Sequence, residues 1–182
     1  MGHLKQGLIH VYTGDGKGKT TAALGLALRA AGHGMHTCFC QFMKGQDYGE
    51  LRGAAMLAGY LTMAQFGRPT FVHLSADGQH STATAEDIRL AQEGLAAARH
   101  AMLSGEYDIV VLDEINVALF FELLTVQDVL SLLDDKPLQV ELVLTGRQVP
   151  PELLARADYV TEMCEVEHPY RRGIQARPGI EF

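Results

Sequence analysis

Near its N-terminus the chain reads Thr13-Gly14-Asp15-Gly16-Lys17-Gly18-Lys19-Thr20-Thr21. An apolar run, residues 8–12, precedes this stretch, and a segment rich in Ala and Leu, residues 22–31, follows it. The first run is β-branched and aromatic enough for a short buried strand, and the second favours a helix that ends at Gly32. A strand, a glycine-rich turn and a helix in this order predict a phosphate-binding loop.

The chemistry of this loop follows from its residue types. Its glycines let backbone N–H groups turn inward without a Cβ in the way, and the positive end of the following helix points at the same place. Lys19 is then expected to reach the outer phosphates of a nucleotide, and the Thr20 hydroxyl to bind the accompanying Mg²⁺.

The loop departs from the general pattern G-x-x-x-x-G-K-S/T in two ways. The first glycine of the pattern would fall at Thr13, but the glycine comes one residue later, at Gly14. Asp15 adds a carboxylate that repels phosphate unless it points away or meets the metal, and its role stays open. The alternative interpretation is a glycine-rich turn that binds no ligand.

Length and charge restrict the class of protein. The chain has 182 residues, which suits one domain, 1–182, with a full core. Acidic residues number 22 and basic residues 15, so the formal charge is −7, which argues against nucleic-acid or anionic-membrane partners. The sequence shows no apolar run of membrane-spanning length and no signal peptide, so we expect a cytoplasmic enzyme.

The three cysteines, Cys38, Cys40 and Cys164, are odd in number and form no C-x-x-C pair. Cys38 and Cys40 share one face of a predicted strand, and Cys164 ends another. Buried structural thiols are the favoured interpretation, and metal or redox roles are the alternative. The histidines show no zinc-binding spacing.

The rest of the chain alternates between strand and helix patterns. Short apolar runs predict strands at residues 36–42, 61–66, 108–114, 140–145 and 159–164. Helical periodicity predicts helices at 50–58, 84–102, 116–122 and 125–133, and a short helix opening at Pro150-Pro151. Residues 67–83 are predicted to be a long loop of the lid or binding type, and residues 165–182 an extended tail packed on the surface. The alternation predicts an α/β fold with a mainly parallel sheet and helices on both faces.

Polar side chains follow several predicted strands at their carboxyl ends, where open α/β sheets bind ligands. Asp113 and Glu114 follow a run typical of a Walker B element, although such a run also occurs by chance. Gln41 and Lys44 are either ligand contacts or part of a solvated turn. Arg147 is placed either to hold a phosphate or to lie on the surface.

The motifs, taken in order, resemble a known family. They are Tyr12 to Ala23, Arg29 to Gly34, Gln41 to Gly45, Val111 to Glu114, Leu144 to Arg147, Ala157 to Met163, His168 to Tyr170, Gly173-Ile174 and Gly179 to Phe182. Nearly the whole chain resembles the P-loop ATP:corrinoid adenosyltransferases, which attach the adenosyl group of ATP to cobalt in vitamin B12 and its precursors. That family's loop is itself an irregular Walker A with threonine where Thr13 stands.

The resemblance implies a P-loop NTPase-like, RecA-like fold and an unusual use of the loop. Co(I) attacks the ribose 5′ carbon of ATP and the whole triphosphate leaves, so the loop holds a leaving group. It also implies Mg²⁺, with Mn²⁺ as a substitute, a homodimer, and a flavoprotein that supplies electrons.

The resemblance further assigns roles to residues. Those for ATP are Thr13, Gly14, Asp15, Gly16, Lys17, Gly18, Lys19, Thr20, Thr21, Arg29 and Arg147. Those for the metal are Thr20, Asp113 and Glu114, those for catalysis Lys19 and Glu114, and those of the corrinoid region Gln41, Lys44, Phe66 and Phe71.

Two features of this chain differ from some family members. It starts almost at the first strand, without the N-terminal extension that helps to cover the site in those members, and it has no Trp near the corrinoid. Phe66 and Phe71 stand in that region, so the aromatic group that displaces the lower axial ligand of cobalt is left open, as is the preferred corrinoid. The rival interpretations are a small-molecule kinase with an arginine lid, for which Arg68, Arg147, Arg171 and Arg172 are candidates, and a RecA-like ATP-binding switch.

Overall fold

In the computed structural model, which describes residues 4–74 and 81–181, the strands form one parallel sheet. Its strands are β1 (Ile9–Thr13), β2 (Thr37–Phe42), β3 (Leu61–Phe66), β4 (Ile109–Asp113), β5 (Glu141–Thr145) and β6 (Tyr159–Glu162). They lie in the order β3-β2-β4-β5-β1-β6, and every neighbouring pair is parallel. The predicted α/β class is therefore confirmed, with a sheet consistent with a P-loop NTPase-like fold.

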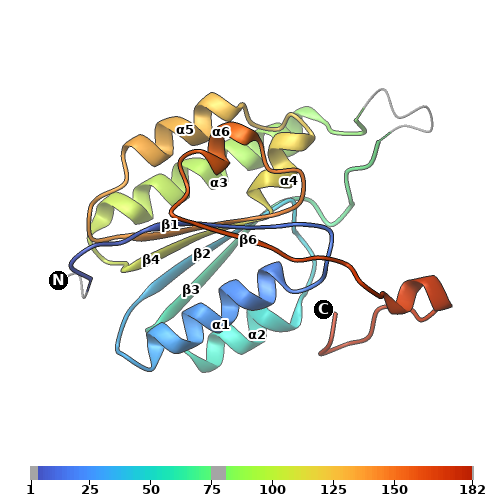
Figure 1. Cartoon of the computed structure of the whole chain (residues 1–182), viewed down its shortest axis with the longest axis horizontal. Coiled ribbons are helices and arrows are strands. Elements are labelled where there is room, and N and C mark those ends of the chain that lie inside the picture. The colour runs from blue at the N-terminus through green and yellow to red at the C-terminus, as the bar shows by residue number, and fades with distance from the viewer. Residues whose placement is uncertain (1–3, 75–80, 182) are drawn as a thin grey trace.

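Helices cover both faces of this sheet (Figure 1). Their bounds are α1 (Lys19–Ala31), α2 (Gly49–Met56), α3 (Ala85–Ser104), α4 (Ile115–Phe120), α5 (Val126–Asp134) and α6 (Pro151–Leu154). The helices α1 and α2 lie below the sheet in Figure 1, and α3, α4, α5 and α6 lie above it. Each face has its own buried cluster, with Ala27 and Ala54 on the α1 side and Met102 and Leu132 on the other.

Local sequence explains where α3 and α5 begin. Thr84 accepts a hydrogen bond from the backbone of Asp87, and the Asp87 side chain accepts one in return from the backbone of Thr84. Thr125 and Asp128 form the same capping box at the start of α5. Each box satisfies two backbone donors that a helix start leaves free. Gly105 ends α3 in the left-handed conformation that suits glycine.

The strand order brings the predicted loop and the predicted acids to one edge of the sheet. Because all strands are parallel, the carboxyl ends of β1, β2, β4 and β5 lie at the same edge. The strand β5 stands between β1 and β4, with Tyr12 opposite Thr145 and Leu112 opposite Leu144. Thr145 thus lies between the glycine loop and Asp113.

Two expectations about this architecture were wrong. Cys38 and Cys40 are buried on one face as predicted, with sulfurs 3.9 Å apart, but Cys164 is exposed because it lies beyond β6, an edge strand whose own residues are all exposed. The tail is not simply extended, since the 3-10 helix η1 (Pro169–Arg172) interrupts it. Pro169 starts this helix and Gly173, left-handed at φ 76°, ends it.

The predicted long loop, residues 67–83, is free of helix wherever it is described, and Leu74 pairs with Ser81 in an isolated bridge. Residues 75–80 of that loop and Phe182 of the tail motif lie outside the described residues. Within the described part of the chain, no helix combines the length and the apolar character needed to cross a membrane.

Candidate active site

The glycine loop lies tightly against the chain that follows β6. A Cβ on Gly14 would come within 2.5 Å of the Met163 carbonyl oxygen, and one on Gly16 within 2.6 Å. The Gly16 N–H donates to that same carbonyl at 2.6 Å, and the Thr13 carbonyl accepts from the Met163 N–H at 2.8 Å. Gly14 and Gly18 have φ of 91° and 124°, which glycine adopts without strain. The glycines are therefore required by close packing and by backbone conformation.

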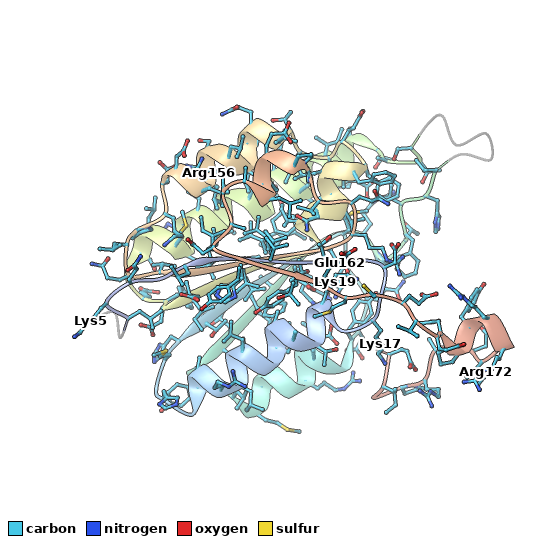
Figure 2. The ribbon with its side chains drawn as sticks, in the orientation of Figure 1. Lys5, Lys17, Lys19, Arg156, Glu162 and Arg172 are labelled. Carbon is cyan, nitrogen blue, oxygen red and sulfur yellow. The ribbon has the colours of Figure 1, made fainter. Side chains whose placement is uncertain are left out.

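The two loop lysines point in different directions. Lys19, only 8% exposed, donates to the carbonyl oxygens of Gly14 and Gly16 at 2.5 and 2.8 Å, so its ammonium lies across the loop. Burial lowers the pKa of Lys19. Lys17 instead reaches the C-terminal tail, where it donates to the Ile180 carbonyl at 2.7 Å and to Glu181 at 3.1 Å. Figure 2 shows Lys19 beside the sheet and Lys17 toward the tail.

Asp113 is the centre of a hydrogen-bond network and is fully buried. Its Oδ1 accepts from the hydroxyls of Thr20 and Thr145 at 2.8 and 2.7 Å. Its Oδ2 accepts from the Lys44 ammonium at 2.8 Å and from the Gln41 amide at 3.2 Å. Four donors with good geometry make the buried charge tolerable and hold the Thr20 hydroxyl in place.

Glu114 follows directly and faces the loop. Its backbone is left-handed, with φ 63°, a conformation that is uncommon for a residue other than glycine and that clusters at functional sites. Its N–H donates to the Thr145 hydroxyl at 3.0 Å. Burial is the main cause that raises the pKa of Glu114, and the negative charge of Asp113 raises it further. A nearby cation would therefore stabilise the ionised form of the Glu114 carboxyl.

Two adjoining cavities meet at Thr20, Thr21 and Glu114. The loop cavity, about 660 Å³, is lined by residues 15–21 of the glycine loop and by Arg147. The outer cavity, about 770 Å³, is lined by Lys44, Phe71 and neighbouring side chains. Both volumes lie in the range of small-molecule sites. The tail residues Ile180 and Glu181 border both cavities.

The donors around this junction suit a hard divalent cation. Mg²⁺ prefers oxygen ligands and is usually held by one or two carboxylates together with substrate phosphates. Here the Thr20 hydroxyl and the Glu114 carboxylate border both cavities, and Asp113 holds the Thr20 hydroxyl. Among the described residues, no group of three or more His, Cys, Asp or Glu side chains forms a metal cage by itself. These residues fit Mg²⁺ shared with a nucleotide.

The structure clarifies Asp15 and Arg147. The Asp15 side chain is exposed at the rim of the loop cavity, and the charge of Arg147 beside it offsets the expected repulsion with phosphate. Arg147 pairs with this carboxylate at 3.6 Å and donates to the Asp15 carbonyl at 3.0 Å. Arg147 therefore lies at the rim of the loop cavity, as its position after β5 predicts.

Six predicted site residues line neither cavity. Thr13, Gly14 and Asp113 belong to the glycine loop and the acid network described above, and the other three are Arg29, Gln41 and Phe66. Arg29 lies in the last turn of α1, exposed, ten residues and about 15 Å along the helix from Lys19. Gln41 is fully buried and bonded to Asp113 and Glu50, so it supports the acids rather than facing a substrate. Phe66 packs into the core beside Phe42, with ring centroids 6.2 Å apart. Gln41 and Phe66 thus face the interior, and Arg29 lies too far along α1 from the glycine loop.

Sequence reasoning gave no role to other residues at this site. Thr145 joins Asp113 to Glu114, and its place as the last residue of a strand was the signal that could have found it. The Glu50 carboxylate accepts a hydrogen bond from the Gln41 amide at 3.1 Å and lies 3.7 Å from the Lys44 ammonium. No sequence signal pairs Glu50 with Lys44. The tail residues Ile180 and Glu181 belong to a motif of the family resemblance, but the sequence predicted no contact for them.

A parallel α/β sheet, a glycine loop before a helix and an acid network beside it define the class of the protein. It is an α/β protein with a P-loop NTPase-like fold.

Comparison with known proteins then gives the family. The profile of the ATP:corrinoid adenosyltransferase BtuR/CobO/CobP family matches residues 5–182. A corrinoid adenosyltransferase of Sinorhizobium sp is 36% identical over 98% of this chain and 81% of its own length. The corrinoid adenosyltransferase CobA of Salmonella typhimurium is 33% identical over 98% of this chain and 87% of its own. The chain belongs to the ATP:corrinoid adenosyltransferase family, a family of transferases.

Proposed function

We propose that this protein transfers the 5′-deoxyadenosyl group of ATP to the Co(I) of a reduced corrinoid and releases triphosphate. The observation that supports this most strongly is the junction of the loop cavity and the outer cavity at Thr20 and Glu114. A nucleotide whose phosphates lie in the first cavity directs its ribose toward the second. Family membership favours this reaction over phosphoryl transfer by a kinase.

The reaction balances without a nucleophile from the protein. The electron pair of Co(I) forms the bond to the 5′ carbon, and the bond from that carbon to the triphosphate oxygen breaks with its electrons on the leaving oxygen. Both phosphoanhydride bonds stay intact. The chain then has two tasks, which are to orient ATP and to stabilise the charge that develops on the triphosphate.

The glycine loop performs the second task. Backbone N–H groups at the start of α1, together with Lys19, present positive charge to the leaving group. Lys17 reaches the same cavity from its rim and exchanges its tail contacts for phosphate oxygens. Since Lys19 is buried, its charge acts in a medium of low dielectric constant and is weakly screened.

The metal belongs to the same task. Thr20 and Glu114 would hold Mg²⁺, or Mn²⁺ in its place, and Asp113 would fix Thr20. When bound, the cation neutralises charge on the triphosphate. The raised pKa of Glu114 supports this assignment, because a nearby cation stabilises the ionised form of a carboxyl that is otherwise poorly solvated.

The outer cavity takes the corrinoid in this proposal. Phe71 lines it and is 57% exposed, so an aromatic face is available to the substrate. We further propose a single domain spanning residues 1–182, a homodimer, a cytoplasmic location, a flavoprotein as the source of electrons, and no nucleic-acid or membrane partner. The net charge of −7 supports the last of these.

The experiment is to mix the protein with ATP, Mg²⁺ and a chemically reduced corrinoid, and to follow the absorbance of Co(I). We expect Co(I) to disappear and a light-sensitive carbon–cobalt product to form at a rate proportional to enzyme. Glu114→Gln is expected to need more Mg²⁺ for half-maximal rate. Unchanged Co(I) absorbance in the complete mixture would contradict the proposal.

A further inference from the structure

The Lys44 side chain lies between the acid network and the outer cavity, which it lines. Its ammonium is 2.8 Å from Asp113 Oδ2, 3.4 Å from the Thr20 hydroxyl and 3.7 Å from Glu50. Burial alone would lower the pKa of Lys44, but Asp113 raises it above its ordinary value, so the group is charged. One end of this residue is therefore fixed at the metal side of the site.

The backbone of Lys44 is fixed against a second segment. Met43, just before it, has φ 57°, a rare conformation for a side chain of this size. A Cβ on Gly45 would come within 2.2 Å of the Gly67 carbonyl oxygen. A Cβ on Gly67 would come within 2.4 Å of the backbone nitrogen of Lys44. The turn after β2 and the start of the long loop thus touch backbone to backbone, without room for a side chain.

More contacts hold the two segments together. The Gln46 amide donates to the Pro69 carbonyl at 2.7 Å. On the opposite side of the loop, Arg68 donates twice to Asp87, at 2.8 Å each. Asp87 belongs to the capping box of α3 and is 4% exposed, so this anchor is part of a fixed helix end. Residues 67–69 are held between the Lys44 turn and α3.

Phe71 follows this anchored stretch by two residues and lines the outer cavity with Lys44. Phe71 is exposed, and its ring lies 6.2 Å from that of His73, whose backbone is bonded to Thr82. Its position therefore depends on the anchored segment before it as well as on His73 after it. A shift of the Lys44 turn therefore moves the Phe71 wall.

We propose that Lys44 is a positioning residue that places the Phe71 wall of the outer cavity, through the contact of Gly45 with Gly67. This inference rests on the proposed function, since it assigns Phe71 to the corrinoid side. It explains why a charged residue bonded to Asp113 stands directly before a glycine that only close packing requires. Lys44 then acts on the corrinoid through the loop.

The test is a double-mutant cycle on KM. Lys44→Met keeps the length of the side chain and removes its charge, and Arg68→Gln releases the loop from α3. Each single variant is expected to raise the KM for reduced corrinoid about fivefold or more, with a smaller change in the KM for ATP. In the double variant, the fold increase in the KM for corrinoid is expected to be well below the product of the two single increases, because both substitutions release the same segment.

Matched controls separate position from charge. Arg89→Gln removes an arginine of α3 that pairs with Glu86 and Glu93 but does not touch the loop, so its KM values should equal the parent's. Lys17→Met removes another lysine of the site and should raise the KM for ATP only. Gly67→Ala leaves Lys44 charged, separates the two segments, and should raise the corrinoid KM as Lys44→Met does.

Two results would overturn the inference while leaving the proposed function intact. One is a Lys44→Met variant with an altered KM for ATP and an unchanged KM for corrinoid. The other is full multiplicativity of Lys44→Met and Arg68→Gln. By contrast, a parent protein that forms no carbon–cobalt product would overturn the proposed function itself. If Lys44→Met does not fold, Gly67→Ala decides the question, because an unchanged corrinoid KM in that variant contradicts the placement of Phe71 through this contact.

Discussion

The two sides of the site differ in how they are built. The inner wall consists of the glycine loop, Thr20, Asp113 and Thr145, where Lys19, Asp113 and Thr145 are buried and the hydroxyls of Thr20 and Thr145 both donate to Asp113. The outer wall consists of residues 67–72 and 179–181, which are mostly exposed and held by a few ion pairs and backbone contacts. Phe71 is 57% exposed and Ile180 is 56% exposed, whereas Asp113 is 0% exposed.

This difference shows where preorganisation is needed. Stabilising a leaving triphosphate requires donors that stand in place before charge develops, and buried, bonded groups meet that need. A large substrate that must enter and leave is better served by a wall with few packed contacts, which opens at a low cost in free energy. We therefore expect inner-wall variants to lose stability or chemistry, and outer-wall variants to change mainly KM.

Asp113→Asn should show the largest effect. The new amide would bring N–H groups against donors already present, such as Lys44, and would leave that ammonium with the more distant Glu50 carboxylate, at 3.7 Å, in place of its 2.8 Å contact with Asp113. Breaking a buried pair in this way costs about 3 kcal/mol, measured as the free energy of unfolding in urea. Asp134→Asn, which removes an exposed ion pair with Arg156, is the control and should cost less than about 1 kcal/mol. Equal losses in the two variants would contradict the contrast between buried and exposed charges.

Lys19→Ala should weaken ATP binding and slow adenosyl transfer by about tenfold or more, since one charge-assisted hydrogen bond contributes about 1.5 to 3 kcal/mol. Calorimetry with ATP and a steady-state rate measure the two effects. Lys5→Ala, at the left edge of the molecule in Figure 2 and away from Lys19, should match the parent. An unchanged ATP affinity in Lys19→Ala would remove the glycine loop from the site.

Asp87→Asn tests the anchor of the outer wall, and its effect depends on pH. Burial alone would raise the pKa of Asp87, but bonds from Arg68 and Thr84 lower it overall. The ionised form therefore stabilises the fold at pH values above the unfolded pKa, and this contribution disappears as the pH falls through the folded pKa.

At neutral pH the loss of this cap should cost about 1 kcal/mol. In thermal melts, the difference in Tm between parent and Asp87→Asn should shrink as the pH falls below about 4. A Tm difference that stays constant from neutral to acidic pH would show that the charge of Asp87 contributes nothing.

Glu181→Gln should have the smallest effect. Glu181 accepts from Lys17 and from Arg177, but these pairs are exposed and contribute little. Freeing Lys17 for phosphate should lower the KM for ATP by less than about threefold and leave the Tm unchanged. A rise in this KM would indicate that Glu181 supports ATP binding rather than competing with it.

Apart from Thr145, the inner wall could be predicted from sequence because its signals are local. Asp113 and Glu114 end an apolar strand, and the loop stands between a strand and a helix, so their meeting follows from the rule for parallel sheets. The family resemblance, carried by ordered motifs along nearly the whole chain, predicted the family that the comparison established. The predicted strands lie within one or two residues of the observed bounds.

The remaining contacts depend on distances that sequence patterns do not contain. The Gln41 side chain could have faced a ligand or the core, and only the neighbouring strand places Asp113 beside it. Arg29 belongs to a motif of the family, but the rise of α1 carries it away from the loop. The contact of Lys17 with Glu181 joins residues 164 positions apart, which no local pattern encodes.

The most direct test of adenosyl transfer is the fate of the phosphates. ATP labelled at the γ position is mixed with Mg²⁺, the protein and a Co(I) corrinoid, and the labelled products are separated. Attack at the 5′ carbon predicts labelled triphosphate in step with the carbon–cobalt bond, little ADP, and no triphosphate when the corrinoid is left out. Stoichiometric ADP that forms with or without the reduced corrinoid would contradict the account and favour a kinase or an ATPase.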